Sequence, residues 1–261
     1  MKMKKALSIM TALALILFFS CVSDSDNVKP GPEEAQEEVE TEGTEMANPQ
    51  TEASGAKYCA LTFDDGPDLT LTPLVLDKLK KHGIVASFFL VGQRVNESVQ
   101  PLLQSMVAMG CELNNHSWGY GSMNNMSADD IKESVGMTTA AIEKYAGVSP
   151  AFFRPPNLAV SAAMYEAIDL PFAEGVLGMD WAGTNTDAEQ RAQNVLNGMR
   201  DGAIILLHDV QPAPHPTPEA LDILIPELLS QGYVFVTLSR LFEIKGVDPN
   251  GAGAVMWKYV E

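Results

Sequence analysis

Positively charged residues are scarce in this chain of 261 residues, in which 17 Lys and Arg stand against 34 Asp and Glu and leave a formal net charge of −17. Binding to a nucleic-acid backbone requires clustered Lys and Arg, so this balance excludes nucleic acid as a partner. Cysteine is also scarce, and Cys21, Cys59 and Cys111 form neither a CxxC motif nor a zinc-finger spacing. The apolar run of residues 6–19 is shorter than the roughly 20 residues that span a bilayer, which argues against a membrane-spanning anchor.

The first 20 residues (1–20) have the pattern of an export signal. Lys2, Lys4 and Lys5 precede the apolar run, as the basic region precedes the hydrophobic region of a secretory signal peptide. Cys21 follows the run after one small residue, and this arrangement resembles a bacterial lipoprotein cleavage site, which implies a lipidated N-terminus at Cys21. An ordinary signal peptide cut nearby is the alternative. We expect an exported lipoprotein of a bacterial cell envelope, with the membrane contacted only through this anchor.

Composition divides the rest of the chain into a tether and a folded part. Residues 21–56 carry ten acids against one lysine and scarcely any large apolar side chain, so we expect a flexible acidic tether there. The apolar content of 46% is ample for a core. We place that core in a single, monomeric domain at residues 57–245, followed by a C-terminal tail at residues 246–261. Cys59 and Cys111 lie in strand-like runs of this domain, where a disulfide and two buried free thiols both remain open.

Strand-like runs alternate with amphipathic helical stretches along the domain. This alternation predicts an α/β fold with a parallel sheet, either open or closed into a barrel. The clearest helices are expected at residues 72–82, at 127–145 with Ser127 as N-cap, and at 218–230 with Thr217 as N-cap. The expected strands are Tyr58–Phe63, Ala86–Val91, Cys111–Asn115, Ala151–Arg154, Phe172–Gly178, Ala203–Leu207 and Tyr233–Thr237.

Polar residues follow five of these strands, at the edge where the functional groups of a parallel sheet gather. Taken singly, each has an ordinary structural explanation, such as a turn with solvated acids or a hydrogen-bonded core histidine. Two adjacent carboxylates at one strand end are costly unless a cation or a proton separates their roles, and a base beside a metal ligand is one solution. Together the residues indicate a catalytic site; they are Asp64 and Asp65, His116, Arg154, Asp180, and His208.

These strand ends resemble the polysaccharide deacetylase (NodB-homology) family, also called carbohydrate esterase family 4. The resemblance covers residues 57–245 and implies a distorted (β/α) barrel. Five family motifs occur in order, namely Thr62–Gly66 (TFDDG), Asn115–Ser117 (NHS), Arg154–Pro156 (RPP), Asp180–Trp181 (DW) and Leu206–His208 (LLH).

The resemblance implies a role for each matched catalytic residue. Asp64 would be the general base, held and polarised by Arg154, and Asp180 would orient His208 as the general acid. Such a pair suits the hydrolysis of an acetyl group, because the base takes a proton from water and the acid protonates the leaving group. Adjacent carboxylates with different fates also fit the rule that environment separates the pKa values of paired acids.

The same resemblance implies a metal site and a substrate pocket. Asp65 and His116 would hold a divalent metal, expected to be zinc, with cobalt or nickel as alternatives. Trp181 and Leu206 would line an acetate pocket, and the backbone N–H of Asn157 would donate to the oxyanion.

The chain departs from the family at the second metal-binding histidine, where Tyr120 stands. A neutral phenol is a weak zinc ligand, so Tyr120 is a doubtful metal position, and Asn124 or Asn125 could approach instead. The third motif also differs, because Asn157-Leu158 replaces the usual aromatic-Gly pair.

The leading hypothesis is a metal-dependent deacetylase of cell-wall or extracellular polysaccharide, acting on N-acetyl groups in preference to O-acetyl groups. An acetylated glycan would be its partner. The alternatives are a glycan-binding lipoprotein of the same fold with little or no turnover, prompted by the missing imidazole, and a deacylase of a non-sugar amide.

Overall fold

The structure, a computed structural model, describes residues 55–182, 187–210 and 217–261. The expected signal peptide, Cys21 and all but the last two residues of the expected tether lie outside the described residues.

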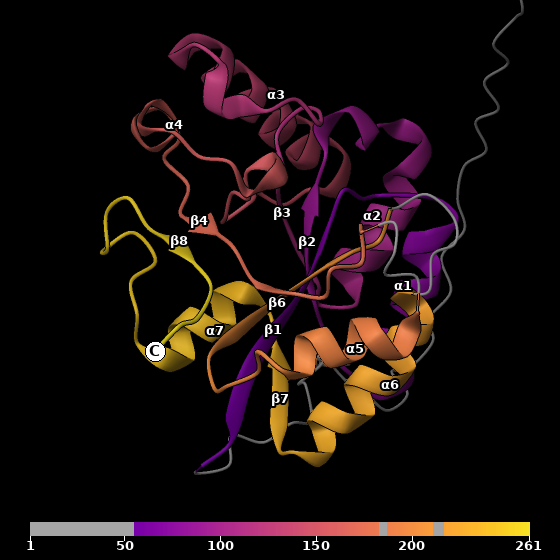
Figure 1. The fold of residues 1–261 in the computed structure, drawn as a ribbon. Coiled ribbons are helices and arrows are strands. Elements are labelled where there is room, and N and C mark those ends of the chain that lie inside the picture. Colours follow the sequence, from indigo (N-terminus) through magenta and orange to yellow (C-terminus); the bar gives the residue numbers. More distant parts are fainter. Residues whose placement is uncertain (1–54, 183–186, 211–216) are drawn as a thin grey trace, which may run out of the picture. The chain divides into compact units, whose positions relative to one another are not determined.

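A parallel sheet built around β1 (Lys57–Asp64) forms the centre of the described fold (Figure 1). Its path is β3-β2-β1-β6-β5, and β7 also pairs with β1. The long strand β1 can serve three partners, because β7 pairs with its first half and β2 with its second half, while β6 pairs along most of its other edge. The bounds are Ser87–Leu90 (β2), Glu112–Asn115 (β3), Val176–Leu177 (β5), Ala203–His208 (β6) and Tyr233–Val236 (β7).

The two edges of this sheet meet in one short segment, residues 172–177. Asn115 at the end of β3 bridges to Phe153, and Phe153 bridges to Phe172 in β4 (Phe172–Ala173). Three residues further along the same segment, β5 pairs with β6. The sheet is thus an open, barrel-like arrangement, which confirms the predicted α/β class with parallel strands.

Two predicted strands are shorter than expected. Ala151–Arg154 is reduced to the single bridge at Phe153, because two prolines without N–H groups follow Arg154. The run Phe172–Gly178 is split into β4 and β5 at Glu174, whose N–H donates to Trp257 and whose carbonyl accepts from Arg154.

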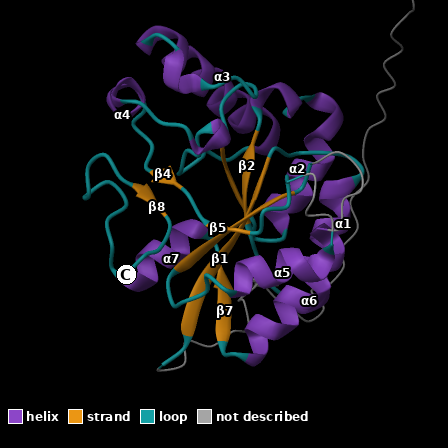
Figure 2. Cartoon of the chain, in the orientation of Figure 1, coloured by secondary structure: helices purple, strands orange, loops and turns teal. Residues whose placement is uncertain are grey.

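Helices surround the sheet (Figure 2). The helices α1, α5 and α6 lie together on one side of β1, and α7 lies on the other. The three predicted helices are present, each with its start or end within one residue of the prediction, whereas α2, α4, α5 and α7 were not predicted. None of the described helices is long and apolar enough to cross a membrane. The bounds are Leu71–His82 (α1), Gln100–Ala108 (α2), Ala128–Ala146 (α3), Ala162–Ala167 (α4), Ala188–Leu196 (α5), Thr217–Ser230 (α6) and Leu238–Lys245 (α7).

The alternation of side chains along β1 separates the core from the site. Cys59, Leu61 and Phe63 are buried in the larger apolar core, beneath α1, α2 and α6. Because successive residues of a strand point to opposite faces, Thr62 and Asp64 lie on the other face. On the neighbouring strand β6 the register pairs Thr62 with Leu206 and Asp64 with His208.

The last 16 residues, for which we expect a C-terminal tail, pack against the domain. The short strand β8 (Met256–Trp257) pairs with β4, and Val260 is fully buried with its N–H donated to Gly202. Cys59 and Cys111 are buried free thiols in the structure.

Candidate active site

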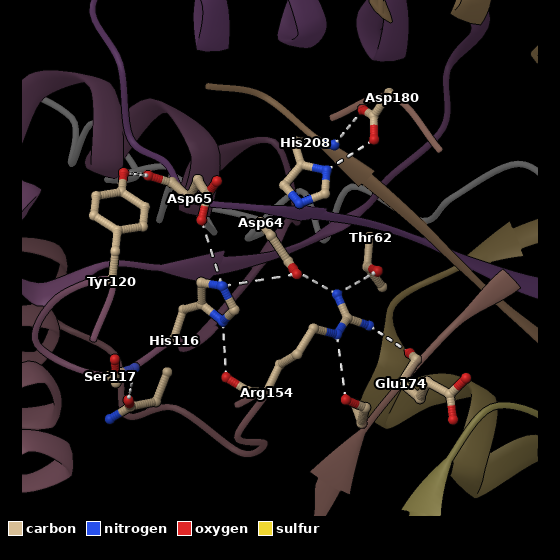
Figure 3. Close-up of polar contacts among 12 residues, drawn as sticks. Thr62, Asp64, Asp65, His116, Ser117, Tyr120, Arg154, Glu174, Asp180 and His208 are labelled. Atoms are coloured by element: carbon tan, nitrogen blue, oxygen red, sulfur yellow. Dashed lines mark hydrogen bonds and ion pairs between the residues drawn. The ribbon is translucent and has the colours of Figure 1, made fainter. Parts of the chain in front are cut away.

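A pocket of about 270 Å³ opens where the strands end, and eight of the ten predicted site residues line it. The other two, Arg154 and Asp180, are buried against Asp64 and His208, as the close-up shows (Figure 3). The structure therefore brings all ten residues together, from segments up to 144 positions apart in the chain. The eight predicted residues among those that line the pocket are Asp64, Asp65, His116, Tyr120, Asn157, Trp181, Leu206 and His208.

Asp64 is held by a buried arginine. The Nη1 atom of Arg154 donates to Asp64 Oδ1 at 2.6 Å and to Thr62 Oγ1 at 2.8 Å. The remaining guanidinium donors bind the carbonyls of Ala173 and Glu174, and the group lies 3.9 Å from the centre of the Phe89 ring. Arg154 is fully buried, so this network fixes both the arginine and the carboxylate it binds. Asp64 keeps its second oxygen on the side of His116, at 3.8 Å from Nε2.

His208 is held from behind by a buried carboxylate. Asp180 Oδ1 lies 2.8 Å from the Nδ1 atom of His208, and Asp180 Oδ2 accepts the backbone N–H of His208 at 2.7 Å. Burial alone would lower the pKa of His208, but the charges of Asp180, Asp64 and Asp65 raise it to about 9. The pKa of Asp180 is held below its usual value, since the ion pair with His208 outweighs the effect of burial. At neutral pH the imidazole therefore carries a proton that it can donate.

Asp65 and His116 converge next to this pair. The Nε2 atom of His116 lies 3.4 Å from Asp65 Oδ1. Its Nδ1 lies 2.7 Å from the carbonyl oxygen of Arg154, which can only accept, so Nδ1 carries a proton and Nε2 faces the carboxylates. Burial lowers the pKa of His116, but the charges of Asp64 and Asp65 outweigh it and raise the pKa; in the neutral ring that binds a metal, Nε2 presents its lone pair. Asp65 itself has a left-handed backbone, with φ of 77°. An imidazole nitrogen and a carboxylate oxygen that face each other in this way suit a divalent transition metal.

Two donors are fewer than the three that a catalytic zinc site usually has. Among the described residues, no group of three or more His, Cys, Asp or Glu side chains is arranged to hold a metal ion. Tyr120 does not supply the missing donor here: its hydroxyl donates to the main-chain oxygen of Asp65 at 3.4 Å and accepts from Arg94 Nε at 2.7 Å. Burial and the charge of Asp65 raise the pKa of Tyr120, which keeps the phenol neutral.

Backbone conformations that side chains rarely adopt gather around the pocket. Five non-glycine residues of the described chain have positive φ, and all follow strand ends or the RPP segment. Strained backbone of this kind costs of order 1–3 kcal/mol per residue and is concentrated at functional sites. Three of these residues, Asp65, Asn157 and Leu158, line the pocket itself. The five are Asp65, Ser117, Asn157, Leu158 and Met179.

Comparisons with known proteins identify the family of the chain. The family model described as "Polysaccharide deacetylase" matches residues 51–172. A solved structure of a family 4 acetyl xylan esterase from Clostridium thermocellum, in complex with a cobalt ion, is 55% identical to this chain. It superposes with a TM-score of 0.76 over 78% of this chain and 99% of the other. The chain belongs to the polysaccharide deacetylase family.

Two curated relatives illustrate the range of this family. A bifunctional xylanase/deacetylase of Pseudobutyrivibrio xylanivorans is 47% identical over 78% of this chain. A peptidoglycan-N-acetylglucosamine deacetylase of Listeria monocytogenes is 36% identical over 71%. The match spans only 33% and 39% of these two proteins, so their whole activities are not carried over.

In this member of the polysaccharide deacetylase family, sequence reasoning missed several residues around the site. Thr62 lies inside the first motif, yet its hydroxyl accepts from Arg154 and donates to Ile205. Thr217 was predicted to cap a helix, but it is the first residue of α6 and its hydroxyl donates to Asp180. Asp209 follows His208 and is fully buried with its pKa raised to about 7, chiefly by burial. Its position directly after His208 was the feature of the sequence that could have identified Asp209.

Proposed function

We propose that this protein is a metal-dependent deacetylase that hydrolyses acetyl groups of an acetylated polysaccharide. The observation that carries the proposal is the pairing of Asp64 with Arg154 and of His208 with Asp180 on adjacent strands facing one pocket. Hydrolysis of an acetyl group needs a base for the attacking water and an acid for the leaving atom, and the two pairs supply both.

The residues of the chain divide this chemistry between them. Asp64 takes the proton of water, because Arg154 fixes one of its oxygens and leaves the other facing the pocket. His208 gives its Nε2 proton to the leaving oxygen or nitrogen, because Asp180 occupies Nδ1. Asp65 and His116 would hold a divalent metal, zinc by expectation, which polarises the acetyl carbonyl and lowers the pKa of water when bound. The N–H of Asn157 would donate to the oxyanion.

The walls of the pocket suit a small acyl group on a sugar. Leu206, Leu177 and Leu158 make part of the lining apolar, and the indole of Trp181 stands at its edge, 42% exposed. An exposed aromatic face beside a small apolar pocket is suited to packing on a sugar ring while the acetyl group enters.

We favour O-acetylated xylan as the first substrate to test, ahead of N-acetylated glycans. The sequence prediction preferred N-acetyl groups, but the solved structure at 55% identity is named an acetyl xylan esterase and the relative at 47% a bifunctional xylanase/deacetylase, whereas the peptidoglycan enzyme is 36% identical. His208 serves either reaction, since an alkoxide and an amide nitrogen both need a proton to leave.

A substrate panel tests this proposal. Purified mature protein is stripped of metal, reloaded with zinc, cobalt or nickel, and assayed for acetate release from acetylated xylan, peptidoglycan and chito-oligomers. We expect release from acetylated xylan with at least one metal. Absence of release from all three substrates with every metal would reject the deacetylase assignment.

A glycan-binding protein with little turnover is the second candidate, because only two metal donors converge in the described residues. It predicts measurable affinity for a glycan in a protein that takes up no divalent ion. Metal content after dialysis against zinc therefore separates the two candidates.

Export and lipid anchoring at Cys21 remain proposals, since both fall on residues outside the described ranges. Family relatives named for peptidoglycan deacetylation support a site of action outside the cell. Detergent partitioning of the full chain, with Cys21→Ser as the control, tests the anchor; partitioning of the two proteins into the same aqueous phase would reject it.

A further inference from the structure

A buried arginine lies behind the general acid pair. Arg191, on α5, is only 2% exposed, and its Nη1 donates to Thr217 Oγ1 at 2.9 Å. A buried guanidinium is costly unless it is paired and hydrogen-bonded. Specific partners therefore hold Arg191 in place. Its hydrogen bond to Thr217 connects it to Asp180.

Thr217 connects this cation to the carboxylate. Its hydroxyl accepts from Arg191 and donates to Asp180 Oδ2 at 3.1 Å. Asp180 Oδ2 also accepts the backbone N–H of His208, while Oδ1 binds the ring at Nδ1. Every oxygen of Asp180 is thus engaged, and a continuous set of hydrogen bonds runs from Arg191 through Thr217 and Asp180 to His208.

We propose that Arg191 and Thr217 are positioning residues for the general acid, which fix the carboxylate of Asp180 and limit how strongly it holds the proton of His208. The proposal concerns the site of the proposed deacetylase and rests on that function only for its effect on turnover. Neither residue is among those that line the pocket.

The charges around His208 set the direction of the effect. Asp180, Asp64 and Asp65 all favour the protonated imidazole, and Asp209 is its neighbour in sequence. Arg191 reaches Asp180 through the Thr217 hydroxyl, and its charge stabilises that carboxylate. Glu219 of α6 is the other acid that interacts with Arg191. Without the cation or the Thr217 hydroxyl, Asp180 keeps only its contacts with the ring and the backbone N–H of His208. His208 then binds its proton more tightly and becomes a weaker acid.

An NMR titration of the His208 ring tests this directly, with zinc-loaded and metal-free protein measured separately and His208→Gln used to assign the signal. In Arg191→Met we expect the pKa of His208 to rise by about half a unit or more, a roughly threefold tighter hold on the proton. Thr217→Val, which is nearly isosteric, should shift it in the same direction by less. Arg191→Lys and Thr217→Ser should restore most of the wild-type value.

Arg200→Gln is the matched control for the loss of one arginine. Arg200 pairs with Glu261 at the surface and precedes the amino end of β6, the end opposite His208. Its removal should leave the titration of His208 unchanged.

Kinetics give a second readout. Once an acetylated substrate is identified, kcat of Arg191→Met should fall several-fold with KM unchanged. The alkaline limb of its pH profile should move to higher pH. An unchanged pKa of His208 in folded Arg191→Met would overturn the proposal, and Thr217→Val decides in the same way if Arg191→Met does not fold. If the wild-type protein releases no acetate, the proposed function fails while the titration still decides this inference.

Discussion

The two sides of the pocket differ in how firmly their functional side chains are held. On the acid–base side (Asp64, Arg154, His208 and Asp180) each group meets a buried opposite charge at 2.6 or 2.8 Å. On the metal side (Asp65, His116 and Tyr120) the two donors are 3.4 Å apart, and Tyr120 is 49% exposed. The described residues therefore fix the proton-transfer groups but include few ligands for a metal. We infer tightly defined acid–base chemistry combined with a weakly held, exchangeable ion.

Removal of the base should produce the largest effect on the acid–base side. Asp64→Asn keeps the size of the side chain but cannot take a proton from water, so we expect acetate release to fall by about 10²–10⁴. Metal uptake should stay close to wild type, because Asp65 and His116 are intact. Asp222→Asn, which removes a surface partner of Lys78 and Lys81, is the control and should be fully active. Near wild-type turnover in Asp64→Asn would remove the base from the mechanism.

Removal of the arginine that holds the base should unfold the domain more easily. Arg154→Met leaves Asp64 buried without its partner, and breaking a buried ion pair in this way costs about 3–5 kcal/mol. Arg94→Met, on the metal side, breaks a part-exposed contact with Asp68 at 3.9 Å and an exposed hydrogen bond to the Tyr120 hydroxyl, and should cost less than about 1 kcal/mol. Urea unfolding of both variants checks the contrast, which fails if the two lose similar stability.

A single substitution on the metal side should raise the affinity for zinc. Tyr120→His introduces an imidazole at the position where the family carries a second histidine, and we expect zinc affinity to rise by about tenfold or more. Tyr120→Phe should leave zinc affinity unchanged, because the hydroxyl binds Arg94 and a main-chain oxygen. Isothermal titration with zinc distinguishes the variants. A marked loss of affinity in Tyr120→Phe would make the phenol a ligand after all.

The pH dependence of stability should report on His208. Its pKa of about 9 lies above the ordinary value of 6.5, so the folded protein binds this proton more tightly than the unfolded chain does. The resulting stabilisation is complete below pH 6.5 and is lost as the pH rises towards 9. The gap in unfolding free energy between metal-free wild type and His208→Gln should therefore narrow over that range. A gap that widens with pH would contradict the assigned pKa direction.

The comparison between the two sides also shows what the sequence could predict. The apolar run before TFDDG predicted β1 and placed Asp64 and Asp65 at its end, because an apolar run and the Gly66-Pro67 turn are local signals. The face on which Asp64 lies was not predicted. The direction of the Tyr120 hydroxyl depends on Arg94, 26 residues away, and no local pattern encodes that contact. Helix α5 was missed because Arg191 occupies a buried position, where a charged residue hides the apolar face of a helix. Thr217 fits the sequence pattern of an N-cap. In the structure its hydroxyl donates to Asp180, 37 residues away, and no local pattern predicts that contact.

The dependence of turnover on bound zinc is the measurement that distinguishes the acid–base side from the metal side. Metal-free wild-type protein is titrated with zinc, and the initial rate of acetate release from acetylated xylan is measured alongside the zinc bound per chain. We predict negligible release without metal and a rate that rises in proportion to occupancy, reaching its plateau at one zinc per chain. Full turnover in the presence of a chelator, or one bound zinc per chain with no release, would contradict the division of the pocket into an acid–base side and a metal side.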